Sequence, residues 1–223
     1  MGEIYRPLRP VVRLAMGVAI ACAIAAQLQF LHAHGILRTG NFFSFFTIDS
    51  NILTMLVLLG LEFTGETAPG WLARRIRGGV TLYMAMTGII YAVLLAPIAA
   101  DVSTQLDWVN AVLHIVGPIV VVADWLLAPP DEVPSRADAL WWLAFPIAWL
   151  GYTVVRGVIV DWYPYPFIDP RDGVEHAAGS WGAVIITSLV LSLLVIVLAL
   201  ALRWLTGIVR GQPAPDALAA SAA

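Results

Sequence analysis

The stretch Asn41-Phe-Phe-Ser-Phe-Phe-Thr-Ile-Asp-Ser-Asn-Ile-Leu-Thr54 opens a long apolar run and yet carries several polar side chains. A polar group inside a bilayer costs free energy unless it finds a partner, so a membrane segment this polar needs an explanation. At about 100° per residue, one face of a helix here carries Ser44, Thr47, Asn51 and Thr54. Asp49 points roughly the other way. This face predicts either hydroxyls packed inside a helix bundle or a nucleophile in a membrane-embedded site.

The composition around this stretch indicates a membrane protein. Hydrophobic residues make up 60% of the chain and charged residues 12%, whereas soluble proteins are about half apolar and about a quarter charged. A length of 223 residues suits one compact bundle rather than several domains. We therefore expect a multi-pass protein of the cell (inner or plasma) membrane, with membrane lipids and no nucleic acid among its partners.

The apolar runs predict an all-α bundle, because a helix needs roughly 20 residues to cross the hydrocarbon. Six runs are long enough, and we place the spans near 12–33, 43–63, 79–100, 107–128, 138–157 and 180–203. Residues 1–210 then form a single six-helix transmembrane domain. The remaining segment, 211–223, is small, contains proline and is predicted to be a disordered tail.

The distribution of arginine predicts the orientation of the bundle, since basic residues favour cytoplasmic loops. All 12 basic residues are arginines. Most of them fall before the first span, in the second and fourth connections and after the last span, at positions 6, 9, 13, 74, 75, 77, 136, 203 and 210. Both termini are therefore predicted to be cytoplasmic.

The longest external connection, 161–176, contains prolines at 164, 166 and 170 together with tyrosine and tryptophan. The prolines prevent a continuing helix, and the aromatic side chains suit the membrane interface. We expect this connection to form an ordered lid over the outer mouth of the bundle.

Depth in the membrane brings three candidate residues to one level. Thr47 lies about 7 Å and His114 about 10 Å below the outer surface, at 1.5 Å per residue. Arg156, on the fifth span, ends near the same outer level. Asp124 lies about 15 Å further down the fourth span, so it cannot be the group that orients His114.

These residues suggest a nucleophilic site. A threonine hydroxyl becomes a useful nucleophile when a neutral imidazole takes its proton, so Thr47 and His114 are the candidate catalytic pair. Arg156 could bind a substrate carboxylate through bidentate contacts. The amides of Asn51 and Asn110 could donate to an oxyanion, and Asp49 completes the candidate substrate-binding set. No metal and no cofactor are expected.

Three motifs in order resemble one family of membrane proteins. They are Phe46-Thr-Ile-Asp-Ser-Asn51, His114-Ile-Val-Gly-Pro118 followed by Asp124-Trp125, and Tyr163-Pro-Tyr-Pro-Phe-Ile-Asp-Pro170. Together they resemble the bacterial "Pr-six-Pr" membrane proteins, which are similar to the eukaryotic androgen-induced and androgen-dependent TFPI-regulating proteins. The resemblance covers nearly all six expected spans.

The resemblance implies a function for the pair of residues that depth had already brought together. The eukaryotic family consists of membrane threonine hydrolases that act on fatty-acid esters of hydroxy fatty acids. Its nucleophile and histidine fall here on Thr47 and His114. The sequence thus predicts an intramembrane hydrolase of such esters or similar acyl lipids. The alternative is a non-enzymatic protein that binds or transports a lipid or small ligand in the same outer-leaflet cavity.

Overall fold

The structure is a computed structural model, and it describes residues 2–64, 70–98 and 106–211. Within these ranges the chain forms helices and loops but no strand, which confirms the all-α prediction. Five helical stretches there are long and apolar enough to cross a membrane: Arg9–Ala33, Gly70–Ile98, Asp107–Leu127, Arg136–Val160 and Trp181–Arg210. They coincide with five of the six expected spans. The expected span 43–63 corresponds to helix α4 (Phe46–Thr64), which is not among the five.

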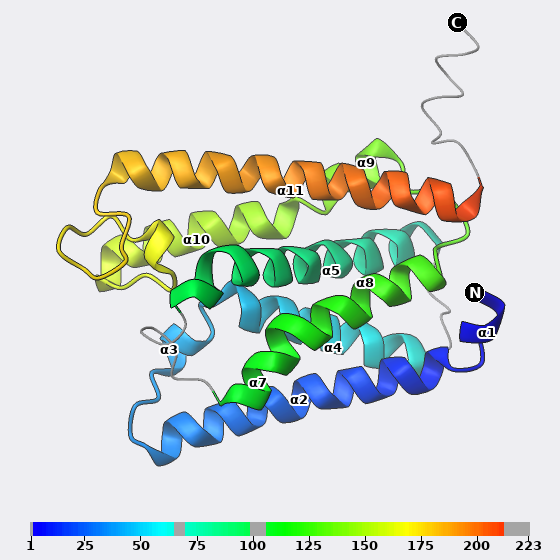
Figure 1. The fold of residues 1–223 in the computed structure, drawn as a ribbon, viewed down its shortest axis with the longest axis horizontal. Helices are drawn as coiled ribbons and strands as arrows, with labels where there is room; N and C mark the ends of the chain where they lie inside the picture. The colour runs from blue at the N-terminus through cyan, green and yellow to red at the C-terminus, as the bar shows by residue number, and fades with distance from the viewer. Residues whose placement is uncertain (1, 65–69, 99–105, 212–223) are drawn as a thin grey trace, which may run out of the picture.

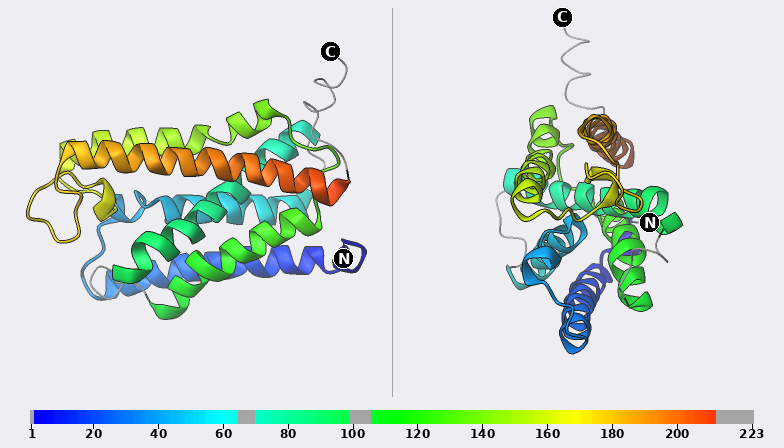
Figure 2. Two further views of the ribbon diagram at one scale, coloured as in Figure 1. Left: turned by 45° about the horizontal axis from the view of Figure 1, so that its top comes forward. Right: turned by 90° about the vertical axis from the view of Figure 1, so that its left-hand side faces the viewer.

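The long helices lie side by side along the longest axis of the molecule (Figure 1). Besides α4 they are α2 (Arg9–Ala33), α5 (Gly70–Ile90), α8 (Gly117–Leu127), α10 (Ala144–Val160) and α11 (Trp181–Arg210). Helix α4 packs against α2 and α5, and α5 also packs against α8. Helices α10 and α11 lie on the side of the bundle away from α2 (Figure 2). Both are mostly exposed, so their outer faces are available to lipid.

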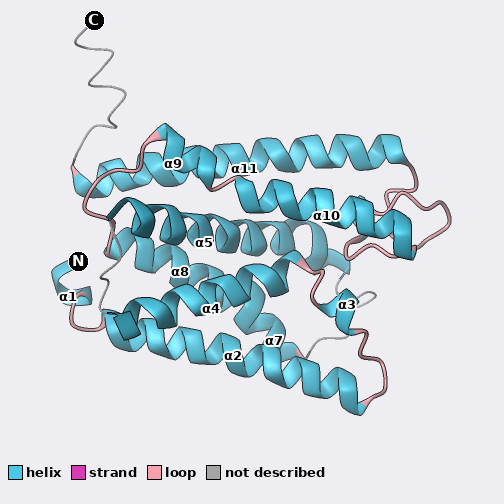
Figure 3. Cartoon of the chain, turned by 180° about the vertical axis from the view of Figure 1, so that it is seen from behind, coloured by secondary structure: helices cyan, strands magenta, loops and turns pink. Residues whose placement is uncertain are grey.

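The bundle has two different ends (Figures 1 and 3). The loop end carries α3 (Thr39–Phe42), the start of α7 (Asp107–Ala111) and the connection between α10 and α11. The terminal end carries α1 (Gly2–Tyr5) and the last residues of α4, α8 and α11. Arginines from the N-terminus, from α5 and from the end of α11 therefore share the terminal end. The side of the membrane that this end faces stays a prediction.

Several helices extend beyond their expected limits for local reasons. The fifth span starts at α9 (Arg136–Trp141), where Ser135 and Asp138 form a reciprocal capping box that satisfies the first free amides. The chain then bends before it continues as α10. Helix α11 begins at the cap Ser180 and runs on to Arg210, where Gly211 takes a left-handed conformation with φ 63°. Beyond Gly211, the predicted tail lies outside the described residues.

Two stretches widen into π-helix, η1 (Tyr91–Leu95) after α5 and η3 (Val112–Val116) between α7 and α8. In η3 the amide of Gly117 bonds the carbonyl of Val112, five residues back. The next such bond would need the amide of Pro118, which proline lacks. The side-chain amide of Asn51 donates to the carbonyl of Leu113 instead, at 3.2 Å. The carbonyl of Leu113 thus lacks this backbone donor, and the side chain of Asn51 on α4 supplies a hydrogen bond in its place.

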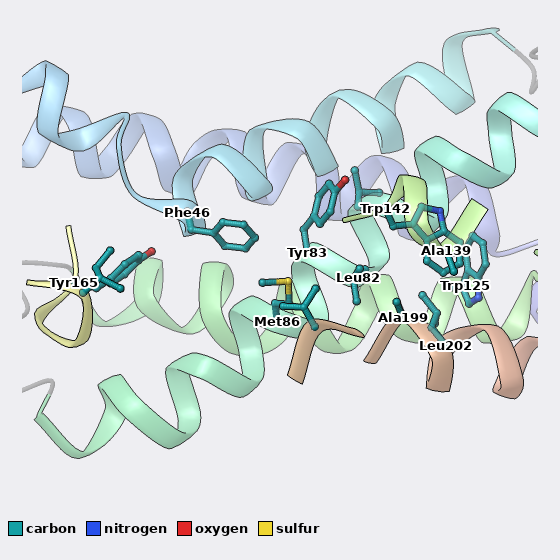
Figure 4. Packing of buried hydrophobic residues seen from close by; sticks show 13 residues of the cluster. Phe46, Leu82, Tyr83, Met86, Trp125, Ala139, Trp142, Tyr165, Ala199 and Leu202 are labelled. Carbon is teal, nitrogen blue, oxygen red and sulfur yellow. The ribbon is translucent and has the colours of Figure 1, made fainter. Parts of the chain in front are cut away.

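The main hydrophobic core follows the inner faces of α4, α5, α9 and α11 (Figure 4). It runs from Tyr165 and Phe46 near the loop end to Trp125 and Trp142 towards the terminal end, with Met86 between them. Aromatic contacts hold both regions, for example the edge-on pair of Trp125 and Trp142 at 5.9 Å. This packing fixes the start of α4, where the polar face begins.

A buried charge cluster joins five helices, α1, α2, α4, α5 and α8, at the terminal end. Asp124 accepts hydrogen bonds from Arg13 Nε at 2.9 Å, from Arg77 Nη2 at 3.4 Å and from the Tyr5 hydroxyl at 2.6 Å. Arg13 also pairs with Glu62 at 3.3 Å. These contacts occupy Asp124 at the end of the bundle opposite Thr47.

Candidate functional site

The polar face of α4 is buried in the bundle, as its helical spacing predicts. Thr47 is 5% exposed, and its neighbours Ser44, Ser50, Asn51 and Thr54 are at most 1% exposed. Thr54 bonds the carbonyl of Ser50, and Ser50 bonds the carbonyl of Thr47. Back-bonding of this kind satisfies hydroxyls inside a helix. The Thr47 hydroxyl differs, because its contact among the described residues is not a back-bond but the Tyr165 hydroxyl, from a distant part of the chain.

Thr47 meets Tyr165 at the N-terminal end of α4. As the second residue of α4, Thr47 has a backbone N–H without an acceptor in its own helix. That N–H donates to the Tyr165 hydroxyl at 3.2 Å, and the Thr47 Oγ1 lies 3.2 Å from the same oxygen. Burial raises the pKa of Tyr165 to about 12, so the phenol keeps its proton at neutral pH. Since its oxygen accepts from the amide, its own hydrogen can be directed to Thr47 Oγ1.

The connection between α10 and α11 folds back over the loop end and carries Tyr165 into the bundle. Asp169 accepts from the Arg171 guanidinium at 2.6 Å, and Arg171 also bonds the carbonyl of Asp161. Burial alone would raise the pKa of Asp169, but the hydrogen bonds from Arg171 outweigh burial and hold it below its usual value. The connection is therefore ordered, as expected of a lid.

Gly157 lets this lid pack closely against α10. A Cβ at Gly157 would lie 2.1 Å from Tyr163 Cε1, two residues before Tyr165. We expect Gly157→Ala to lower the free energy of unfolding by about 1–3 kcal/mol, the usual cost of overpacking, and to shift the lid. The control is Gly151→Ala on the same helix, where an added Cβ meets nothing within 4 Å. Thermal unfolding in detergent measures both variants, and equal melting temperatures would contradict the predicted clash.

Thr47 lines a cavity of about 170 Å³, which we call the threonine cavity. Its walls come from α4, α5, η1, α10, the lid and α11, and most of the lining side chains are apolar. Its hydroxyl-bearing residues are Thr47, Thr87, Tyr91, Tyr165, Ser188 and Ser192. The cavity thus offers an acyl chain a largely apolar surface, with several hydroxyl-bearing residues among its walls.

His114 lies on η3, where its ring stacks on Tyr91 of η1 with ring centroids 4.5 Å apart. His114 Nδ1 lies 3.3 Å from the carbonyl oxygen of Asn110. A carbonyl only accepts, so this contact requires the hydrogen on Nδ1 and leaves a lone pair on Nε2 of the neutral ring. Nε2 makes no hydrogen bond within the described residues. π-Helical turns occur frequently at functional sites, and here two of them meet at one aromatic stack.

Thr47 and His114 lie in neighbouring hollows. Within the part of the chain that the structure describes, no hydrogen bond joins their side chains. His114 lines a second hollow, and Tyr91 lines both, so Tyr91 forms part of the wall between them. Asn51 links the two backbones, because its amide donates to the carbonyls of Thr47 and Leu113 at 2.9 and 3.2 Å.

The remaining candidate residues have specific places. The side-chain amide of Asn51 is used on those two carbonyls, and that of Asn110 donates to the Tyr91 hydroxyl at 2.5 Å. Asn51 thus uses both hydrogens of its amide on backbone carbonyls, whereas Asn110 uses one of its two on Tyr91. Arg156 donates to Asn41 at 2.7 Å and lies over the Trp162 ring, outside the lining of the threonine cavity. Asp49 is half-buried on the opposite face of α4.

Sequence reasoning singled out neither Tyr165 nor Tyr91 as site residues. Tyr165 lies in the motif Tyr163–Pro170, but nothing in that motif indicates that its second tyrosine reaches Thr47. Tyr91 lies inside the expected span 79–100, and nothing in the sequence around it indicates a contact with His114. Only the tertiary fold brings Tyr165 to Thr47 and Tyr91 to His114.

No family model matches the chain, and comparisons with curated proteins and with solved structures returned no similar protein. The family resemblance therefore rests on the three sequence motifs. Among the described residues, no three histidine, cysteine, aspartate or glutamate side chains are grouped as a metal site would require.

Proposed function

We propose that this protein is an intramembrane lipid-ester hydrolase in which Thr47 is the nucleophile and His114 the general base. The observation that carries the proposal is the placement of Thr47, a buried hydroxyl on the wall of a largely apolar cavity, 3.2 Å from the hydroxyl of Tyr165. The resemblance to the threonine hydrolases supports the same pair. Esters of hydroxy fatty acids or similar acyl lipids are the proposed substrates, and no cofactor is involved.

The chemistry would proceed through an acyl-enzyme. Thr47 Oγ1 attacks the ester carbonyl while His114 Nε2 takes its proton, and the histidine then protonates the departing alcohol. Water activated by the same histidine cleaves the acyl-threonine and releases the acid. The oxyanion forms beside the positive end of α4 and the O–H of Tyr165, both of which favour negative charge. Because Tyr91 lies between the two hollows, its ring must rotate before His114 reaches Thr47.

The membrane setting completes the proposal. We place α4 as a sixth span and both termini in the cytoplasm, so the loop end faces the outer leaflet of the cell membrane. Substrate enters from that leaflet, and Arg156 binds its carboxylate. Arg156 is half-buried and makes no ion pair within the described residues, so its charge is available to an anion.

One observation favours the alternative, a protein that binds or transports a lipid without cleaving it. Thr47 pairs with Tyr165 rather than with His114, and the two candidate catalytic side chains line different hollows. If Tyr91 does not move, the hollows serve as binding sites only.

A fluorophosphonate probe separates the two functions. We expect intact-mass analysis to find one adduct on the wild-type protein and none on Thr47→Ala. The matched control is Thr54→Ala, which removes a buried, back-bonded hydroxyl from the same helix and should keep the adduct. An adduct on all three proteins would place the reactive group elsewhere. No adduct on folded wild-type protein would favour lipid binding.

A further inference from the structure

The second hollow is a groove on the other side of α5, between α8 and α11, with a volume of about 870 Å³. We call it the histidine groove. Its volume lies within the range of about 300–1,000 Å³ that is typical of ligand sites. Small residues of α5, of η1 and of the short 3-10 helix η2 (Ala96–Ile98) line it, namely Ala85, Gly88, Ala92 and Ala96. A stripe of small residues alone does not indicate a ligand, so the evidence for a ligand comes from the polar groups of the groove.

His114 is a polar group that lacks a partner in this groove. It is 6% exposed, and only its Nδ1 is hydrogen-bonded within the described residues. Tyr91 is the only other described lining residue whose side chain can hydrogen-bond, and its hydroxyl already accepts from Asn110. Nε2 is not among the fully buried side-chain atoms of the described residues that lack a hydrogen bond, so it is accessible where His114 lines the groove. A polar atom without a partner in an apolar setting is costly. The acceptor Nε2 therefore favours a ligand that brings a hydrogen-bond donor.

The shape of the groove suits one extended acyl chain. From His114 to Leu126 the lining helix advances about 18 Å at 1.5 Å per residue. One leaflet of a bilayer provides about 15 Å of hydrocarbon, half of the usual thickness. The wall on this stretch includes Ile119, Val122 and Leu205, which are apolar. Ala92 and Ala96 extend the groove beyond His114 towards the loop end, which leaves room for a small head group.

We propose that the histidine groove binds a single-chain lipid whose head group carries hydroxyls. The head lies beside Ala92 and Ala96 and donates a hydrogen bond to His114 Nε2. The chain follows α8 and α11 towards the terminal end. The groove is distinct from the threonine cavity, although Tyr91 lines both and His114 is also the proposed base, and lipid binding in the groove does not require ester hydrolysis.

A photoactivatable lipid that cannot be hydrolysed tests this site. The probe is a monoalkyl glycerol ether with a diazirine in its chain, added to the protein in phosphatidylcholine nanodiscs. We expect peptide mapping to find crosslinks on groove residues of α8 and α11, and about tenfold fewer on Ala92→Phe, because the added ring fills the groove. Val93→Phe is the matched control, since Val93 is the next residue, is 64% exposed and lines neither hollow.

The head group is tested with the same probe after methylation of both hydroxyls. Loss of the donor should lower crosslinking of the wild-type protein, whereas His114→Leu should crosslink both probes equally. Crosslinks spread over outward residues of α11 such as Leu193 and Leu200, unchanged in Ala92→Phe, would show ordinary surrounding lipid and overturn the proposal. Because the probe is an ether, this result stands apart from failure of the fluorophosphonate experiment.

Discussion

Replacement of His114 by alanine is expected to lower ester turnover by about 10²–10⁴-fold, the usual contribution of a general base. The physical reason is the free Nε2 of the ring, since its proton lies on the Nδ1 that faces the carbonyl of Asn110. Turnover of a fatty-acid ester by purified protein in detergent micelles measures the loss. Added imidazole should restore part of the activity, because it can enter the space that the missing ring leaves.

The rescue separates a catalytic role from a structural one, because His114→Ala also removes the stack on Tyr91. A folded variant that imidazole does not rescue would indicate that the ring only supports the packing. His34→Ala is the matched control: His34 is an exposed histidine after the end of α2 and should keep full turnover. Unchanged turnover in His114→Ala itself would refute the assignment of the base.

Replacement of Asp124 by alanine is expected to lower the free energy of unfolding by about 3–5 kcal/mol, the usual cost of breaking a buried ion pair. Arg13, which is 1% exposed, loses two hydrogen bonds to Asp124, and Arg77 and Tyr5 each lose one. The buried guanidinium of Arg13 then retains a weaker set of partners. Denaturant unfolding in detergent, followed by tryptophan fluorescence, measures the change, since Trp125 is adjacent.

The matched control is an exposed ion pair at the same end. Arg74 and Glu132 pair at 2.7 Å, but the Glu132 side chain is 75% exposed. We expect Glu132→Ala to cost only about 0–1 kcal/mol, because water solvates Glu132, and Arg74 keeps Asp138 as a second ion-pair partner at 3.8 Å. Equal losses in the two variants would show that burial of the Asp124 cluster adds nothing to stability. Turnover should survive in Asp124→Ala protein that remains folded, because the cluster lies far from Thr47.

The local sequence was sufficient to predict the helices, because helix formation in a membrane depends on local composition. Long apolar runs need internally bonded backbone in a membrane, so composition alone predicts a helical protein. The same applies to the buried face of α4, since helical spacing decides that Thr47 and Asn51 share one side. Helix limits were less accurate, because capping at Ser135 and Gly211 depends on a few residues outside the apolar runs.

By itself the sequence determined the helices and the polar face of α4, and it predicted similar membrane depths for Thr47 and His114. Depth is a single coordinate, however, and it left open how the helices are arranged around the bundle axis. The tertiary structure decided that the lid brings Tyr165 to Thr47 and that the two π-helical turns stack Tyr91 on His114. It also placed Thr47 and His114 in separate hollows, with Tyr91 in the wall between them. The position of Tyr91 depends on packing between helices that are far apart in the chain, and local spacing does not determine it.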